Sequence, residues 1–126
     1  MKKKRILVDM SASIIHHGHI RLLKKAKRYG KVIVGLTIDN EIKKYKGFIP
    51  ELNFLQRREI LKELRCVDEV IASKWIITQS FLDKNKIDIV ISGADYSSRK
   101  FTTKSIIFPR TKGISSSKIR KRFFKK

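Results

Sequence analysis

Short apolar runs alternate with amphipathic segments along this chain, and this alternation restricts the fold more than any other feature. Five runs have the length and the apolar, β-branched character of buried strands: residues 4–10 (KRILVDM), 31–39 (KVIVGLTID), 67–72 (VDEVIA), 88–93 (DIVISG) and 105–110 (SIIFPR). Strands that alternate with helices pair in parallel, because each crossover helix returns the chain to the same end of the sheet. We therefore expect an α/β fold, with a mostly parallel five-stranded sheet and helices on both faces.

The segments between these runs carry helical periodicity. Helices are predicted from Gly18 to a C-cap at Gly30, over residues 54–65 and 78–86, and from the serines at 115–117 onward. Residues 40–53 contain the breakers Gly47 and Pro50, and are expected to form a loop after one helical turn.

Length and composition limit the class of protein. At 126 residues the chain is expected to form a single domain, 1–126. Its 31 Lys and Arg residues outnumber 11 acids, for a net charge of +20, which attracts polyanions or an anionic surface. The single cysteine, Cys66, excludes an intramolecular disulfide and a cysteine zinc cage. The opening MKKKRILVDM fits neither a secretory signal nor a membrane span, so a cytoplasmic location is expected.

All three histidines lie within four positions, His16, His17 and His19, directly after the first strand. A helix that begins here presents unpaired backbone N–H groups and a positive dipole end, which favour an anion, and Gly18 allows close approach. A metal site is the weaker interpretation, because no further histidine or cysteine is at hand to complete a zinc shell. Neither the histidine cluster nor the positive net charge of the chain excludes a nucleic-acid contact.

A second candidate anion site lies almost a chain length away, in RTKGISSSKIR (110–120). Arg110 ends a strand, Gly113 loosens the turn, and Ser115–Ser117 meet a helix start. Both segments follow carboxyl ends of strands, where open parallel sheets bind ligands. Two helix N-termini at one edge suggest a polyphosphate held between them.

The motif HHGH together with RTKGISSSKIR resembles the HxGH nucleotidyltransferase superfamily. YKGF, RCVDEV, Trp75 and RTKGIS are similar to its cytidylyltransferase branch, which acts on glycerol 3-phosphate, phosphocholine and phosphoethanolamine. The opening DMSASIIHHGH looks more like cytidylyltransferases of phosphonate biosynthesis associated with phosphoenolpyruvate mutase. The resemblance implies a Rossmann-like nucleotidyltransferase fold. It also implies transfer of CMP from CTP, with Mg²⁺, to a small phosphonate or phosphomonoester, such as 2-aminoethyl- or 2-hydroxyethylphosphonate or glycerol 3-phosphate.

The resemblance also implies roles for individual residues. Catalytic roles fall on His16, His19, Lys46 and Arg110. Nucleotide binding falls on Met10, Ser11, His16, Gly18, His19, Asp95, Arg110, Thr111, Gly113, Ile114, Ser115 and Ser116. Acceptor binding falls on Ser13, Lys46, Arg57, Trp75 and Tyr96, and no residue is assigned to a metal. Relatives dimerise through the segment that corresponds to Arg65–Val70, so a homodimer with Cys66 as a packing residue is expected.

Two positions depart from the family pattern. Ser13 stands where relatives usually carry Asp, and Ala94 replaces the first of two acids, which argues against a choline acceptor. A relative that binds nucleotide without turnover is therefore one alternative. An adenylyltransferase is another, since GISSSKIR is also similar to the signature of those enzymes. A non-catalytic nucleic-acid-binding module is the third, and it is disfavoured because no aromatic-rich platform or base-reading motif is present.

Overall fold

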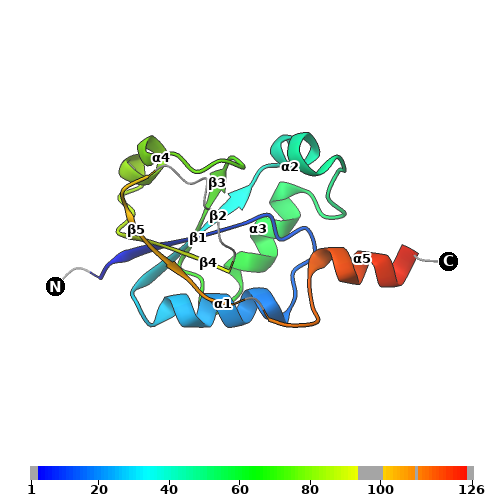
Figure 1. Cartoon of the computed structure of the whole chain (residues 1–126), viewed down its shortest axis with the longest axis horizontal. Helices are drawn as coiled ribbons and strands as arrows, with labels where there is room; N and C mark the ends of the chain where they lie inside the picture. The colour runs from blue at the N-terminus through cyan, green and yellow to red at the C-terminus, as the bar shows by residue number, and fades with distance from the viewer. Residues whose placement is uncertain (1–2, 94–100, 110, 125–126) are drawn as a thin grey trace.

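The computed structural model describes residues 3–93, 101–109 and 111–124. Five parallel strands form one sheet in the order β3-β2-β1-β4-β5 (Figure 1). They are β1 (Arg5–Met10), β2 (Lys31–Thr37), β3 (Glu69–Ser73), β4 (Ile89–Ser92) and β5 (Lys104–Ile107). The register places Val8 of β1 between Val34 and Ile91. The predicted α/β class with a five-stranded parallel sheet is confirmed.

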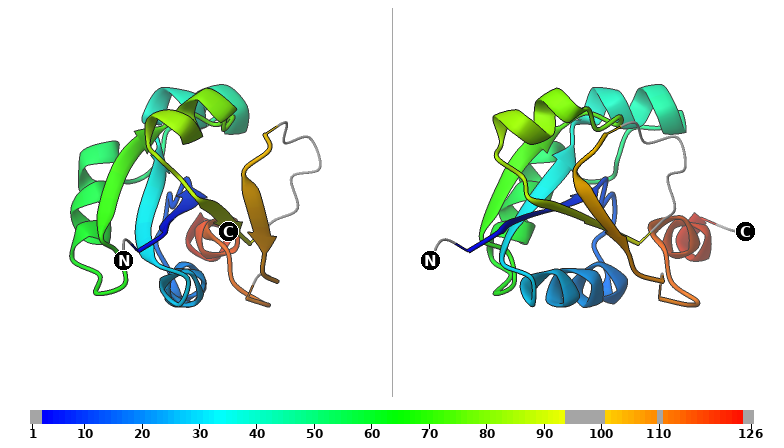
Figure 2. Two further views of the ribbon diagram at one scale, coloured as in Figure 1. Left: turned by 90° about the vertical axis from the view of Figure 1, so that its left-hand side faces the viewer. Right: turned by 60° about the vertical axis from the view of Figure 1, so that its left-hand side comes forward.

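Helices cover both faces of this sheet. They are α1 (His17–Lys27), α2 (Asp39–Lys46), α3 (Phe54–Lys62), α4 (Gln79–Lys84) and α5 (Ser116–Phe124). Figure 2 shows α1 and α4 on opposite sides of the strands. The order of strands reverses direction at β1, which is the point where such sheets place ligands.

The alternation of side chains along β1 divides the core in two. Ile6 and Val8 pack in one cluster with Leu23 of α1 and Leu61 of α3. Leu7, between them, belongs to the opposite cluster, with residues of α4 such as Leu82. Successive strand side chains point to opposite faces, so an apolar run without alternation is what a strand buried on both faces needs.

Two local predictions were wrong. Residues 39–46 form a two-turn helix rather than a loop, because Asp39 and Glu41 in its first turn and three lysines in its last turn complement the helix dipole. Gly47, at φ 79°, then ends it with a left-handed C-cap.

Helix α1 ends at Lys27 with Arg28 as its C-cap, before the predicted Gly30. Gly30 serves another purpose, since a Cβ there would lie 2.2 Å from the backbone oxygen of Lys4.

The segment expected at a dimer contact precedes and enters β3, the strand at one edge of the sheet. Cys66 packs against the core cluster that includes residues of α1 and α3, and the expected dimer contact stays a prediction. Asp68 forms a 2.6 Å ion pair with Lys27 and accepts a hydrogen bond from the Val32 backbone (2.8 Å). Among the described helices, none has the length and apolar character needed to cross a membrane.

Candidate active site

A pocket of about 460 Å³ opens at the edge of the sheet where the strands end. The N-termini of α1 and α5 and the C-terminus of α2 contribute to its walls. The structure thus brings two distant sequence segments together, as predicted from strand polarity. The predicted site residues that line the pocket are Met10, Ser11, His16, Gly18, His19, Lys46, Trp75, Thr111, Ile114, Ser115 and Ser116.

His16 and His19 close the N-terminus of α1 through a reciprocal pair of hydrogen bonds. The Gly18 backbone N–H donates to Nδ1 of His16 (3.1 Å), and the His16 backbone N–H donates to Nδ1 of His19 (3.2 Å). This is a capping box built from imidazoles instead of hydroxyl and carboxylate groups. Because each Nδ1 accepts, each neutral ring carries its proton on Nε2. In their neutral forms the two rings therefore present Nε2–H donors at the start of α1.

The environment of His16 favours the neutral ring. Burial lowers the pKa of His16, and the nearby charge of His17 lowers it further. A donor of this kind adds to the positive end of the α1 dipole, so this helix start attracts phosphate oxygens at neutral pH.

Gly18 is needed for this arrangement because its surroundings leave no room for a side chain. A Cβ at Gly18 would lie 2.9 Å from Cε1 of His16 and 3.4 Å from Cγ2 of Ile114. The imidazole of His16 thus lies over the glycine, while Ile114 approaches from the segment before α5. A larger residue at 18 would displace the histidine that caps the helix.

Three serines form the opposite wall, at the start of α5. Ser115 caps the helix by accepting from the Lys118 backbone N–H (3.0 Å). The Ser116 hydroxyl donates to the Ile14 carbonyl (2.7 Å) and accepts from the Ile14 N–H (3.2 Å). These two hydrogen bonds join α5 to the loop that precedes the histidines. Ser116 therefore fixes one helix N-terminus beside the other.

Lys46 and Trp75 form a third side of the pocket. The ring of Trp75 stacks on Tyr45 of α2 (centroids 5.3 Å apart, 10° between planes). The ammonium of Lys46 lies 5.7 Å from the centroid of the Trp75 ring. Glu41 holds the backbone of this segment, since its carboxylate accepts from the Trp75 N–H (3.1 Å). The lysine, which ends α2, is thus brought to the ligand space together with an aromatic face.

The structure does not place Arg57 in the pocket lining. Its side chain is fully buried, and its guanidinium donates to the carbonyls of Ser11 (2.6 Å), Thr37 (2.9 Å) and Leu52 (3.0 Å). It also pairs with Asp39 (2.6 Å). These bonds tie the ends of β1 and β2 to the start of α3. Arg57 thus braces the site from behind, and its contact with the acceptor stays a prediction.

Ser13 also lies outside the lining. Its hydroxyl is buried and makes no hydrogen bond with any described residue. Gly113 shapes the turn before α5 at φ 79° and does not line the pocket. Asp95, Tyr96 and Arg110, and Ala94, lie outside the described residues, so their predicted roles stay predictions.

Several lining residues were missed from the sequence. Arg21 and Lys25 lie one helical turn apart on the α1 face that follows Gly18, and their i, i+4 spacing was the available signal. Thr37 and Ser92 stand at the ends of β2 and β4, and Asp9 stands near the end of β1. The other missed residues are Leu22, Gly93 and Pro109. Strand-end position, more than residue type, marks most of this set.

The chain matches a known protein family over the segments that form this pocket. A family model described as cytidylyltransferase-like matches residues 11–122, nearly the whole chain. The chain belongs to the cytidylyltransferase-like family. The matched range begins before the capping box of His16 and His19 and ends within α5, so it includes both helix N-termini of the pocket. The predicted family and enzyme class, a nucleotidyltransferase of the cytidylyltransferase type, are confirmed.

Individual relatives agree with this family. A glycerol-3-phosphate cytidylyltransferase of Staphylococcus aureus is 32% identical over 98% of this chain and 97% of its own length. An FAD synthase of Pyrococcus horikoshii is 36% identical over 75% of this chain and 65% of its own length.

A crystal structure supports the fold of this cytidylyltransferase-like chain. The lipopolysaccharide core biosynthesis protein of Thermoplasma volcanium superimposes with a TM-score of 0.74, at 24% identity. The match covers 86% of this chain and 98% of that one. The Rossmann-like arrangement expected from the motifs is thereby confirmed.

Proposed function

We propose that this protein transfers CMP from CTP to a small phosphomonoester or phosphonate and releases pyrophosphate. The observation that carries the proposal is the convergence of the two helix N-termini, with His16, His19 and Ser115, on one pocket that Lys46 also lines. An arrangement of N–H donors and cations with few acids suits a triphosphate. Asp9 is the acid of the described lining.

The proposed reaction needs little proton chemistry. An anionic oxygen of the acceptor phosphate attacks the α-phosphorus of CTP, and a new P–O bond forms. The bond from that phosphorus to the β-phosphate oxygen breaks, and the electron pair leaves with pyrophosphate. The attacking oxygen is already charged, so no general base is required. The protein contributes position and stabilisation of charge on the phosphoryl oxygens, which suits neutral Nε2–H donors and helix N-termini.

Mg²⁺ is part of the proposal as the ion that neutralises the triphosphate. Among the described residues no group of three or more His, Cys, Asp or Glu side chains gathers into a metal cage. Mg²⁺ is commonly held by one or two carboxylates together with substrate phosphates, so Asp9 with the phosphate oxygens suits it. A cation there would lower the charge repulsion that an incoming phosphate meets.

For the acceptor, we propose an anionic compound without a quaternary ammonium group, glycerol 3-phosphate first and a small phosphonate second. The relative from Staphylococcus aureus names the first compound. Lys46, beside the Trp75 ring, supplies a cation for the acceptor phosphate and disfavours a second cation on the same aromatic face.

An acceptor panel tests this assignment. The enzyme is incubated with CTP, Mg²⁺ and glycerol 3-phosphate, 2-aminoethylphosphonate, 2-hydroxyethylphosphonate or phosphocholine, and the products are identified by phosphorus NMR. A CDP-linked product from glycerol 3-phosphate or a phosphonate supports the proposal. A product from phosphocholine alone contradicts it. A parallel reaction with ATP is included because one relative is an FAD synthase, and FAD contains an AMP unit. Transfer of AMP in preference to CMP would contradict the choice of CTP as the nucleotide.

We also propose a homodimer through residues 65–70. Its support is the position of β3 at a sheet edge, next to this segment. Light scattering coupled to size-exclusion chromatography tests it, with a mass of twice 14.7 kDa expected. A monomer at micromolar concentration would contradict it.

A further inference from the structure

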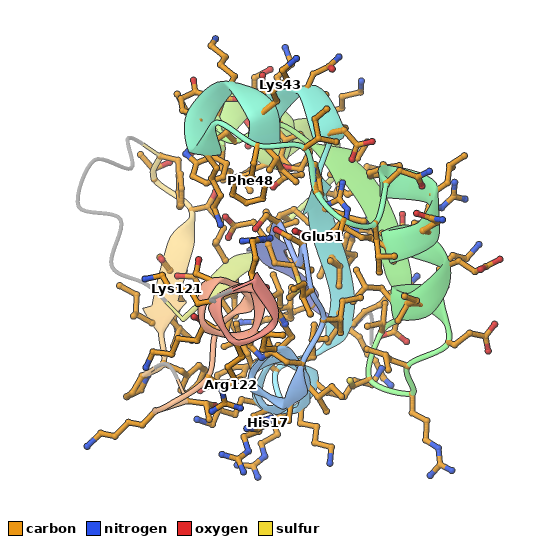
Figure 3. The ribbon with its side chains drawn as sticks, turned by 90° about the vertical axis from the view of Figure 1, so that its right-hand side faces the viewer. His17, Lys43, Phe48, Glu51, Lys121 and Arg122 are labelled. Carbon is orange, nitrogen blue, oxygen red and sulfur yellow. The ribbon has the colours of Figure 1, made fainter. Side chains whose placement is uncertain are left out.

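An ion pair joins α5 to the segment that follows α2. The guanidinium of Arg120 donates from Nε and Nη2 to the two carboxylate oxygens of Glu51, each at 2.7 Å. The same guanidinium stacks over the ring of Phe48, 4.1 Å from its centroid. Figure 3 shows Phe48 and Glu51 between α2 and the end-on view of α5. We call Arg120, Glu51 and Phe48 the clasp.

The two ends of the clasp lie beside opposite walls of the pocket. Phe48 follows Lys46 by two residues, and Lys46 lines the pocket. Arg120 follows Ser116 by one helical turn, and Ser116 also lines it. The clasp therefore connects the end of α2, which carries Lys46, with α5 through side chains that do not line the pocket.

The clasp places a negative charge among the many cations around the pocket. Helix α5 carries Lys118, Lys121 and Arg122 besides Arg120, and has no acid over its range. It lies beside a pocket that Arg21, Lys25 and Lys46 make positive. Before an anion binds, these charges repel one another, and Glu51 supplies a compensating negative charge.

The ion pair of Arg120 and Glu51 is better ordered than an ordinary surface ion pair. Exposed pairs contribute little because two mobile side chains must be ordered. Here the contact is bidentate, the aromatic ring covers one face of the guanidinium, and the side chains are 20% and 36% exposed. The hydrogen bonds from Arg120, and to a smaller extent its charge, also lower the pKa of Glu51, so the carboxylate stays ionised at neutral pH.

We propose that Arg120, Glu51 and Phe48 are positioning residues that hold α5 and the end of α2 at a fixed separation, so that the triphosphate site is assembled before the nucleotide arrives. The proposal rests on the function proposed above. When a binding-competent arrangement is only partly populated, the apparent affinity falls by that fraction. Loss of the clasp therefore weakens CTP binding, while saturating CTP restores the arrangement and the rate.

Steady-state kinetics of Glu51→Gln and Arg120→Met test this. We expect KM for CTP to rise roughly tenfold, with kcat within about twofold of wild type. Lys121→Met is the matched control, because Lys121 is an exposed cation of the same helix that points away from the clasp (Figure 3). The exchanged pair Glu51→Arg with Arg120→Glu is expected to recover most of the affinity. Unchanged KM in both single variants would overturn the proposal, as would an equal rise in Lys121→Met.

Hydrogen exchange of the full-length protein without ligand separates this proposal from the proposed function. Faster exchange of backbone amides in residues 116–122 of Glu51→Gln, with other helices unchanged, supports the clasp even if CTP proves not to be the substrate. Wild-type exchange in that segment would overturn it even where CTP activity is present. Uniformly faster exchange over the whole chain would indicate a general loss of stability and would also overturn it.

Discussion

The guanidinium of Arg57 forms a 2.6 Å ion pair with Asp39, although the arginine side chain is fully buried. The remaining donors of Arg57 reach backbone carbonyls of Ser11 and Thr37, which both line the pocket. A buried charge is costly unless it is paired and hydrogen-bonded, and here Asp39 and three backbone carbonyls accept from the guanidinium. Burial lowers the pKa of Arg57, while Asp39 opposes that effect and keeps the charge. This residue thus supports the floor of the site from behind.

Replacing Arg57 by Met should therefore act first on stability. The change leaves three backbone carbonyls and Asp39 without this partner, which we expect to lower the free energy of unfolding by about 3 kcal/mol. Urea titration followed by circular dichroism measures it. Arg58→Met, at the half-buried neighbouring position, is the control and should stay within about 0.5 kcal/mol. Wild-type stability with a raised KM for the acceptor would instead support a direct role in acceptor binding.

His16→Asn separates the capping role from the chemical role of this histidine. Asparagine is a good N-cap, so α1 should form, but the Nε2–H donor is lost. We expect kcat to fall on the order of 10²–10³-fold, as for removal of one donor to a developing oxyanion. His17→Asn is the matched control, because His17 is exposed and does not line the pocket. Equal kcat values for the two variants would contradict the assignment.

The lowered pKa of His16 predicts a pH dependence of stability. The ordinary pKa of a histidine is 6.5, and burial in the folded protein holds the pKa of His16 below that. As pH falls through about 6.5, the unfolded chain takes up the proton first, so the free energy of unfolding decreases until the folded pKa is passed. Above this window the contribution is fully present. Thermal melts from pH 8 to 5 measure it; His16→Asn should flatten the dependence, and an unchanged slope would count against it.

Lys46→Met tests the third wall of the pocket. We expect a loss of about 10² in kcat/KM for the acceptor, because a cation that faces the phosphate is removed while its apolar stem is kept. Lys43→Met, an exposed lysine of the same helix that points outward in Figure 3, should behave as wild type. Similar activities for both variants would show that Lys46 does not contact the acceptor.

Much of the scaffold could be predicted because the sheet is buried on both faces. Strands such as β2 read as continuous apolar runs, and the rule that ligands bind at carboxyl ends of parallel strands placed 16–19 beside 114–116 without any coordinates. The helix of residues 39–46 was missed because most of its residues are polar. The feature that predicts it is the placement of acids in its first turn and lysines in its last turn, which a search for apolar periodicity overlooks.

The features of the site that the sequence did not reveal were hidden for a different reason. Nothing in the local sequence says that Arg57 points inward, because its partners Ser11, which directly follows β1, and Thr37, which ends β2, meet it only in the folded chain. Likewise, the pairing of Glu51 with Arg120 spans 69 positions. Arg21 and Lys25 follow helical spacing, but only the tertiary structure turns that face toward the pocket.

The central claim is that the pocket between α1 and α5 binds a triphosphate and transfers CMP from it. The most direct test is the release of pyrophosphate from CTP by the wild-type protein with Mg²⁺ and glycerol 3-phosphate, alongside His16→Asn and His17→Asn. We expect acceptor-dependent release by the wild type and by His17→Asn, and loss on the order of 10²–10³-fold in His16→Asn. Tight nucleic-acid binding at physiological salt, with no pyrophosphate released from CTP or ATP, would contradict it.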